Sequence, residues 1–258
     1  MTQDPSNGNY MLVMNIMKVD LRNYLQQNHS QLTWKERIQI TFDIINALDN
    51  IHCENAIHRD LHSGNILLKS RWSISDLGFC GPADKSTKST YGNLPYIAPE
   101  VIAGKEYTFK SDIYSIGMLM WEISSGQPPF GDRNHDSNLA VNIINGIRPK
   151  VVPGTPLEYK NLMEQCWDAD SIKRPDIQTL SRKIRKINLR YRNIPDEQTQ
   201  PKTNSNFINY ASSRLFITSK VHNFKDMPEP RNATEGIIFY SNLIYSILLL
   251  INNIFTFF

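Results

Sequence analysis

The residues best suited to chemistry in this chain are two aspartates and an asparagine that lie close together in the sequence. Asp60 and Asn65 belong to the segment HRDLHSGN, residues 58–65, and Asp76 opens the triplet DLG. A carboxylate can orient a hydroxyl group and accept its proton. Carboxylate and amide oxygens are also the ligands that Mg²⁺ prefers. The pattern predicts proton transfer beside a hard cation, and the alternative is a set of turn-forming polar residues in a loop.

The order and spacing of three motifs resemble those of eukaryotic protein kinases. HRDLHSGN fits the catalytic-loop pattern H-R-D-L-x-x-x-N, DLG stands where D-F-G normally occurs, and APE follows at residues 98–100. The resemblance covers roughly residues 4–187. It implies transfer of the ATP γ-phosphoryl group to a protein hydroxyl, in which Asp60 orients and deprotonates the acceptor. In the same scheme Asn65 and Asp76 hold Mg²⁺.

The resemblance also assigns residues to the adenine site of ATP. Met14 falls at the gatekeeper position, and residues 15–17 correspond to the hinge, whose backbone groups receive adenine. Asn15 and Met17 are the hinge residues expected to bind the cofactor. Leu67 matches the apolar residue that packs under the adenine ring.

Structural and regulatory roles follow from the same resemblance. His58 and Leu77 match members of the apolar spine of active kinases, and Asp112 matches the buried aspartate that holds the catalytic-loop backbone. Glu100 and Arg174 resemble the family's buried ion pair. Arg59 is the expected partner of a phosphate on the activation segment, where the candidate acceptors are Ser86, Thr87, Ser89, Thr90 and Tyr91. An ordinary polar loop is the equally weighted alternative for that segment.

Substrate choice is weakly specified by the sequence. The strings YIAPE and CW…RP look like those of the tyrosine-kinase-like group, whose members mostly phosphorylate serine and threonine. His62 stands where such enzymes usually carry a lysine that reaches the transferred phosphate. Histidine is a weaker, pH-dependent cation. Serine or threonine is the expected acceptor, and tyrosine stays open.

Parts of a complete kinase site do not occur in these 258 residues. No G-x-G-x-x-G precedes the catalytic loop, and neither a V-A-I-K-like lysine nor its helical glutamate partner is found. ATP would meet half a site, open to water, where charge interactions are weak. We therefore expect the chain alone to be inactive and its N-terminal lobe to be absent. The alternative function is a non-catalytic, pseudokinase-like interaction module.

The hydrophobic pattern predicts a mainly α fold: a kinase-like C-terminal lobe with a hinge strand and a short β-hairpin. T-x-x-E at residues 33–36 favours the start of a long helix. A helix over about 110–125 is apolar on nearly every side, which indicates central burial, with Ser111 as its cap. The strand expected before the turn at residues 4–9 is missing. Further expected elements are helices over 137–147, 156–166 and 175–187, the last opening with Pro175, and a hairpin over 66–69 and 72–75.

Composition divides the chain into three parts. Residues 1–187 form the partial kinase domain, residues 188–235 are polar, basic and expected to be disordered, and residues 236–258 are almost entirely apolar. The last part is long enough to span a bilayer. A membrane anchor is one interpretation, and a gene-model artefact is the favoured one. The net charge of +3 gives no reason to expect a nucleic-acid partner, so the expected partners are ATP and a protein substrate.

The cysteine count and the N-terminus bear on the compartment. The three cysteines are far apart and include no C-x-x-C pair, which is typical of reduced thiols. The polar N-terminus does not resemble a secretory signal. The expected location is cytoplasmic, with a tail-anchored membrane protein as the alternative.

Overall fold

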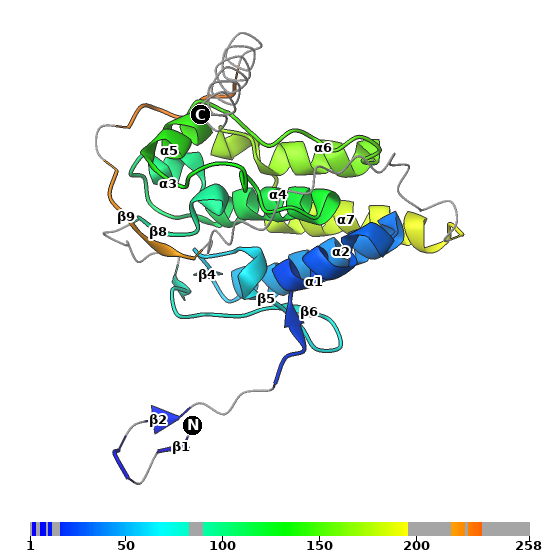
Figure 1. The fold of residues 1–258 in the computed structure, drawn as a ribbon, viewed down its shortest axis with the longest axis horizontal. Helices are drawn as coiled ribbons and strands as arrows, with labels where there is room; N and C mark the ends of the chain where they lie inside the picture. Colours follow the sequence, from blue (N-terminus) through cyan, green and yellow to red (C-terminus); the bar gives the residue numbers. More distant parts are fainter. Residues whose placement is uncertain are drawn as a thin grey trace, which may run out of the picture.

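The computed structural model describes residues 2–3, 6–8, 10–11, 16–82, 90–195, 218–224 and 227–233. Over these residues the chain is a mostly helical lobe with short strands at its edges (Figure 1). This confirms the prediction of a mainly α fold. The helices are α1 (Leu21–Asn28), α2 (Trp34–Cys53), α3 (Pro99–Ile102), α4 (Phe109–Ser125), α5 (Ser137–Ile144), α6 (Leu157–Cys166) and α7 (Ile177–Arg192).

Helix α4 lies at the centre of the lobe. All ten residues of 111–120 are buried, as the apolar pattern predicts. Gly117 lets α6 approach closely, because a Cβ there would lie only 3.0 Å from the Cβ of Cys166. The helix ends at Gly126, whose φ of 72° is the left-handed conformation that glycine adopts without strain. The central helix is therefore fixed by contacts on every side.

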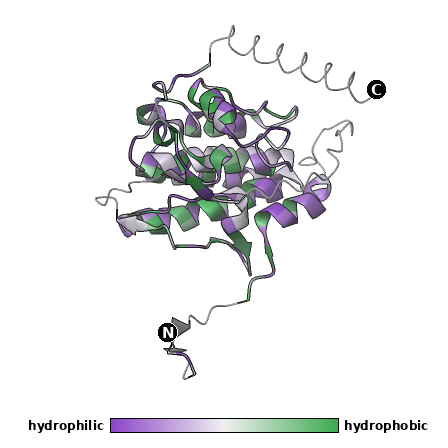
Figure 2. Cartoon of the chain, turned by 60° about the vertical axis from the view of Figure 1, so that its left-hand side comes forward, coloured by the Kyte–Doolittle hydropathy of each residue, from purple (hydrophilic) through white to green (hydrophobic). Residues whose placement is uncertain are grey.

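Helix α2 packs along α7 (Figure 1). Its predicted capping box is present: the Glu36 N–H donates to Thr33 Oγ1 at 3.2 Å, and the Thr33 N–H donates to Glu36 Oε2 at 2.7 Å. Ile38, Ile45 and Leu48 are fully buried. The helices of the lobe carry both hydrophobic and hydrophilic residues, as expected where one face packs in a core and the other meets water (Figure 2).

The strands bring distant residues of the candidate site together. The predicted hairpin forms from β5 (Ile66–Leu68) and β6 (Trp72–Ile74), and β3 (Val19–Asp20) pairs with β5. The Ser75 N–H donates to Asn65 O at 2.8 Å, which continues the pairing beyond β6. Asn65 and Asp76 thus emerge at the same end of the hairpin. On the other side of the loop, β4 (Ala56–Ile57) pairs with β7 (Gly81–Pro82).

The N-terminal strand prediction is wrong in one respect. A short strand, β1 (Thr2–Gln3), does precede the turn and pairs with β2 (Tyr10–Met11). Backbone hydrogen bonds do not require apolar side chains, so a polar two-residue segment can supply them. The hydrophobic pattern carries no signal for such a strand.

Two predicted helix starts also require correction. Thr108 is the cap of α4, and Ser111 lies inside the first turn, where its Oγ accepts from the Thr108 N–H at 3.1 Å. For α7 the cap is Asp176, whose carboxylate accepts from the Thr179 N–H at 2.6 Å, so Pro175 precedes the helix. In both cases a hydrogen bond to a neighbouring polar residue decides the start.

The C-terminal part of the chain returns to the lobe. Within residues 188–235, α7 runs to Arg192, and residues 218–224 and 227–233 lie against the lobe. Strand β9 (Lys220–His222) pairs with β8 (Thr90–Gly92). Among the described residues, no helix has both the length and the apolar character to cross a bilayer. The candidate anchor, residues 236–258, lies outside the described residues.

Candidate active site

Asp112 organises the loop that carries Asp60. Its Oδ2 accepts from the His58 N–H at 2.8 Å, and its Oδ1 accepts from the Arg59 N–H at 3.0 Å. His52 at the end of α2 contacts the same carboxylate, with Nε2 2.9 Å from Oδ2. Asp112 is 1 % exposed. Two consecutive backbone amides are therefore held from the central helix α4.

These hydrogen bonds hold a strained backbone. Arg59 has a φ of 72°, in the left-handed region that costs a non-glycine residue about 1–2 kcal/mol. Hydrogen bonds to a buried charged group are individually worth about that much or more. The loop conformation is thus imposed by tertiary contacts and not by the local sequence.

His58 links the loop to the segment before Asp76. Its ring is fully buried, and Nε2 lies 3.0 Å from Ser75 O. Because a carbonyl oxygen can only accept, Nε2 carries the ring proton and donates it. Nδ1 then accepts from the Asp60 N–H at 3.3 Å. One histidine therefore positions both carboxylate-bearing segments.

Asp60 is a buried carboxylate with partners at both oxygens. Ser219 Oγ donates to Oδ1 at 2.7 Å, and His62 Nε2 lies 3.7 Å from Oδ2. Burial alone would raise the pKa of Asp60. The contacts with His62 and Ser219 and the nearby histidines act in the opposite direction and prevail, so the pKa lies below its ordinary value. The group is ionised at neutral pH and able to accept a proton.

His62 is oriented towards Asp60. The Gly64 N–H donates to His62 Nδ1 at 3.1 Å, so the neutral ring carries its proton on Nε2, which faces the carboxylate. The residue is buried, at 8 % exposure, and its ring lies near that of Tyr96. The residue expected to reach a phosphate therefore lies beside the proposed base.

Asn65 and Asp76 offer oxygen ligands at one end of the hairpin. Asn65 Nδ2 donates to Asp60 O at 3.0 Å, which leaves its amide oxygen as the group able to bind a cation. Asp76 is exposed and has a φ of 57°. One amide oxygen and one carboxylate suit Mg²⁺, which keeps several waters and needs few protein ligands. Over the described ranges, no cluster of three or more His, Cys, Asp or Glu residues forms a separate metal site.

Glu100 and Arg174 form a bidentate ion pair inside the lobe. Arg174 Nη1 and Nη2 lie 2.7 Å from Glu100 Oε1 and Oε2, respectively. The guanidinium also donates to Asp168 O at 2.7 Å and to Lys110 O at 2.9 Å. Arg174 is 1 % exposed. The pair joins α3 to the segment before α7.

Other residues with expected roles lie at the rim. Leu77 is 58 % exposed, so it does not join His58 in a buried apolar spine in this structure. The Arg59 guanidinium donates to Phe79 O at 3.3 Å and to Pro82 O at 3.0 Å. Met17 and Leu67 are half-buried. Met14 and Asn15 lie outside the described residues, as do Ser86, Thr87 and Ser89.

Two features beneath and beside the loop were missed by sequence reasoning. Tyr96 Oη donates to Glu122 Oε2 at 2.5 Å, both side chains are buried, and burial raises the pKa of Glu122. The sequence signal that could have indicated this contact is a single acidic residue, Glu122, in a largely apolar helix. Ser219 and His222 were also missed, since a polar tail carries no hydrophobic period to indicate docking.

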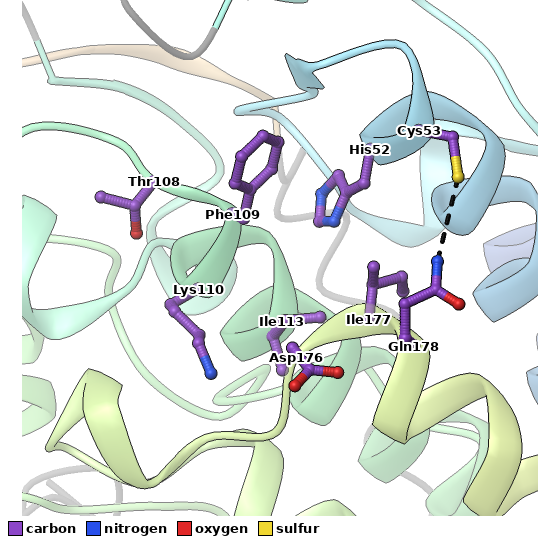
Figure 3. A pocket seen from close by; sticks show the side chains of 9 residues that line it. All are labelled: His52, Cys53, Thr108, Phe109, Lys110, Ile113, Asp176, Ile177 and Gln178. Atoms are coloured by element: carbon purple, nitrogen blue, oxygen red, sulfur yellow. Dashed lines mark hydrogen bonds between the residues drawn. The ribbon is translucent and has the colours of Figure 1, made fainter.

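A pocket lies on another part of the lobe, between the end of α2 and the starts of α4 and α7 (Figure 3). The rings of His52 and Phe109 pack there with centroids 4.8 Å apart, and Gln178 Nε2 donates to Cys53 Sγ at 3.9 Å. His52 connects this pocket to Asp112. None of the proposed catalytic or metal-binding residues lines it.

Known proteins that are similar to this chain in sequence are protein kinases, in agreement with its motifs. The family model for protein tyrosine and serine/threonine kinases matches residues 2–184. The chain is 34 % identical over 183 residues to a dual serine/threonine and tyrosine protein kinase of Mus musculus, covering 69 % of this chain and 19 % of the relative. For the Homo sapiens protein of that name the identity is 36 % over 171 residues, covering 64 % and 18 %. The chain thus spans about a fifth of the length of these curated relatives.

Proposed function

Because this chain belongs to the protein tyrosine and serine/threonine kinase family, we propose that it supplies the catalytic lobe of a serine/threonine protein kinase. The observation that supports this proposal most directly is the ionised carboxylate of Asp60. It lies on the loop that Asp112 holds, and its backbone accepts a hydrogen bond from Asn65. Asp60 orients the acceptor hydroxyl and takes its proton. Asn65 and Asp76 hold Mg²⁺, which neutralises phosphate charge when bound.

The role of His62 differs from that of a phosphate-binding lysine. Its Nε2 lies 3.7 Å from Asp60 Oδ2, and this contact is among those that hold the pKa of Asp60 below its ordinary value. A more stabilised carboxylate is a weaker base. We therefore propose that His62 lowers the proton affinity of Asp60 through this contact. His62→Ala, which removes this contact, should raise the pKa of Asp60, as followed in the pH dependence of the transfer rate.

The test is γ-phosphate transfer by the protein expressed from the native transcript. The 258 residues alone are expected to transfer little phosphate, because no glycine-rich loop or strand lysine is among them. Asp60→Asn should lower the rate by roughly 10²–10⁴-fold, the usual contribution of a general base. Glu106→Gln, at an exposed position between α3 and α4, is a matched control that should retain the rate. Equal transfer by the wild type and Asp60→Asn would refute the proposal.

Binding separates the kinase from the alternative, a non-catalytic interaction module. Mg²⁺-dependent ATP binding should weaken in Asp76→Asn, which lacks a ligand charge. Transfer to no acceptor by the native-transcript protein, with folding intact, would favour the interaction module.

A further inference from the structure

The C-terminal segment 218–224 lies across the face that presents Asp60. Its strand β9 pairs antiparallel with β8, and Figure 1 shows the two strands side by side. Lys220 lies opposite Gly92, Val221 opposite Tyr91 and His222 opposite Thr90. The strand therefore has a defined register next to the APE segment.

Ser219, immediately before β9, reaches the proposed catalytic base. Its Oγ donates to Asp60 Oδ1 at 2.7 Å, within the range of about 2.6–3.2 Å at which a general base can take a proton. With this segment in place, Asp60 is only 4 % exposed. The contact joins residues 159 positions apart in the sequence.

His222 fixes the other end of the strand. Its Nε2 lies 2.9 Å from Gly92 O, and its side chain is 9 % exposed. Burial lowers the pKa of His222, which keeps the ring neutral and lets Nε2 donate to the carbonyl. Val221 between these anchors is 64 % exposed. The short segment is thus held by Ser219 and His222, with Val221 turned to solvent.

The chain beyond residue 224 has its own attachment. The Arg231 N–H donates to Ile144 O at 2.9 Å. Asn232 accepts from the Ala169 N–H at 3.0 Å and donates to Asp168 Oδ1 at 2.9 Å. Gly146 makes room for this contact, because a Cβ there would lie 2.1 Å from Ala233 N. This second attachment keeps residues 218–224 at a high local concentration near Asp60.

We infer that residues 218–224 occupy in cis the acceptor-peptide site of this kinase, with Ser219 as an intramolecular phosphoacceptor. The inference rests on the proposed function. The acceptor site then takes extended serine peptides that pair with β8. A serine is selected because the strand backbone runs close to Asp60, and a tyrosine hydroxyl would extend much further from the same backbone position.

The transfer step balances with ATP as the phosphoryl donor. Ser219 Oγ forms a bond to the γ-phosphorus, the bond from that phosphorus to the β,γ-bridging oxygen breaks, and ADP leaves. The hydroxyl proton passes to Asp60. The product phosphoserine carries a charge of about −1.5 to −2 beside a carboxylate. Like-charge repulsion should then release β9 and open the site to other substrates.

Docking is tested without catalysis, on the full chain. Tyr91 directs its N–H and C=O to the Tyr107 hydroxyl, so the ladder hydrogen bonds to β9 run through the neighbouring pairs, one of which is Gly92 with Lys220. Lys220→Pro should break β9, since proline lacks the N–H that pairs there, while Lys220→Thr should keep it. The position is exposed, so neither change disturbs the core. Hydrogen exchange at the Thr90 and Gly92 amides should accelerate at least tenfold in Lys220→Pro only. A labelled peptide of residues 218–224 should bind Lys220→Pro at least tenfold more tightly than Lys220→Thr. Equal exchange and equal binding in the two variants would overturn the inference.

Transfer is tested with the native-transcript protein, ATP and a general acceptor protein. Mass spectrometry should find phosphate on Ser219 at a rate independent of protein concentration, and Ser219→Ala should increase labelling of the general acceptor. Labelling of the general acceptor without Ser219 would overturn the acceptor role. Labelling of neither would refute the kinase function itself, and peptide binding would still decide whether the segment docks.

Discussion

Replacing Asp112 by asparagine should release the catalytic loop. Asparagine has the same shape, but one carboxylate oxygen becomes an NH₂ group that cannot accept a hydrogen bond. Asp112 accepts from the His58 and Arg59 amides at 2.8 and 3.0 Å and contacts His52 at 2.9 Å. In Asp112→Asn the remaining amide oxygen can accept the hydrogen bonds of one former carboxylate oxygen. The partners of the other oxygen, which include a backbone N–H, then face the NH₂ group.

The magnitude follows from these contacts. A hydrogen bond to a charged group contributes about 1.5–3 kcal/mol. Asp112→Asn loses the charge at all of these contacts and one accepting atom outright, which corresponds to about 3–6 kcal/mol of unfolding free energy. The strained backbone at Arg59, whose φ of 72° is then no longer imposed by Asp112, favours local relaxation of the loop. The loop should therefore loosen before the rest of the lobe unfolds.

Urea denaturation and hydrogen exchange together test this reasoning. The unfolding free energy should fall by the stated amount, and the His58 and Arg59 amides should lose most of their protection. Glu106→Gln, on the surface between α3 and α4, is the control and should change neither quantity appreciably. A loss below about 1 kcal/mol with both amides still protected would show that Asp112 does not hold the loop.

Further predictions concern the lobe that supports the site. Arg174→Met leaves the Glu100 carboxylate buried and unpaired and should cost about 3–5 kcal/mol in urea denaturation, whereas adding Glu100→Gln should recover part of that loss. Burial lowers the pKa of His29 to about 4, so stability should fall by up to about 3 kcal/mol between pH 6.5 and 4, and His29→Asn should remove that dependence. Tyr96→Phe removes a donor from buried Glu122 and should cost about 1.5–3 kcal/mol.

The pH prediction has a definite sign. The unfolded chain protonates His29 near pH 6.5, while the folded chain does so only near pH 4, so the unfolded state binds more protons in between. Stability is therefore present above pH 6.5 and lost as the pH falls through that window. An identical pH slope in the wild type and His29→Asn would contradict this assignment. Strictly additive losses in the Arg174 and Glu100 variants would contradict the ion pair.

Much of the site and its scaffold was readable from local patterns. The capping box at Thr33 and Glu36 and the apolar stripe of α2 fixed that helix, because both depend on residues within a few positions of each other. The hairpin that carries Asn65 and Asp76 was likewise predicted from two short apolar runs. Helix α1 was not predicted. It is short, and its cap, Asp20, also belongs to a strand, so two weak signals overlap.

The sequence by itself determined the residue types available for chemistry, the family motifs and the elements whose periodicity is local. Only the tertiary structure decided how those residues are held. The strained Arg59 and the orientation of His58 depend on Asp112 and Ser75, which lie 53 and 17 positions away. The contact between Ser219 and Asp60 likewise depends on a return of the chain that no local pattern encodes. Hydrogen bonds between distant segments carry no sequence period, and they fix the geometry on which function depends.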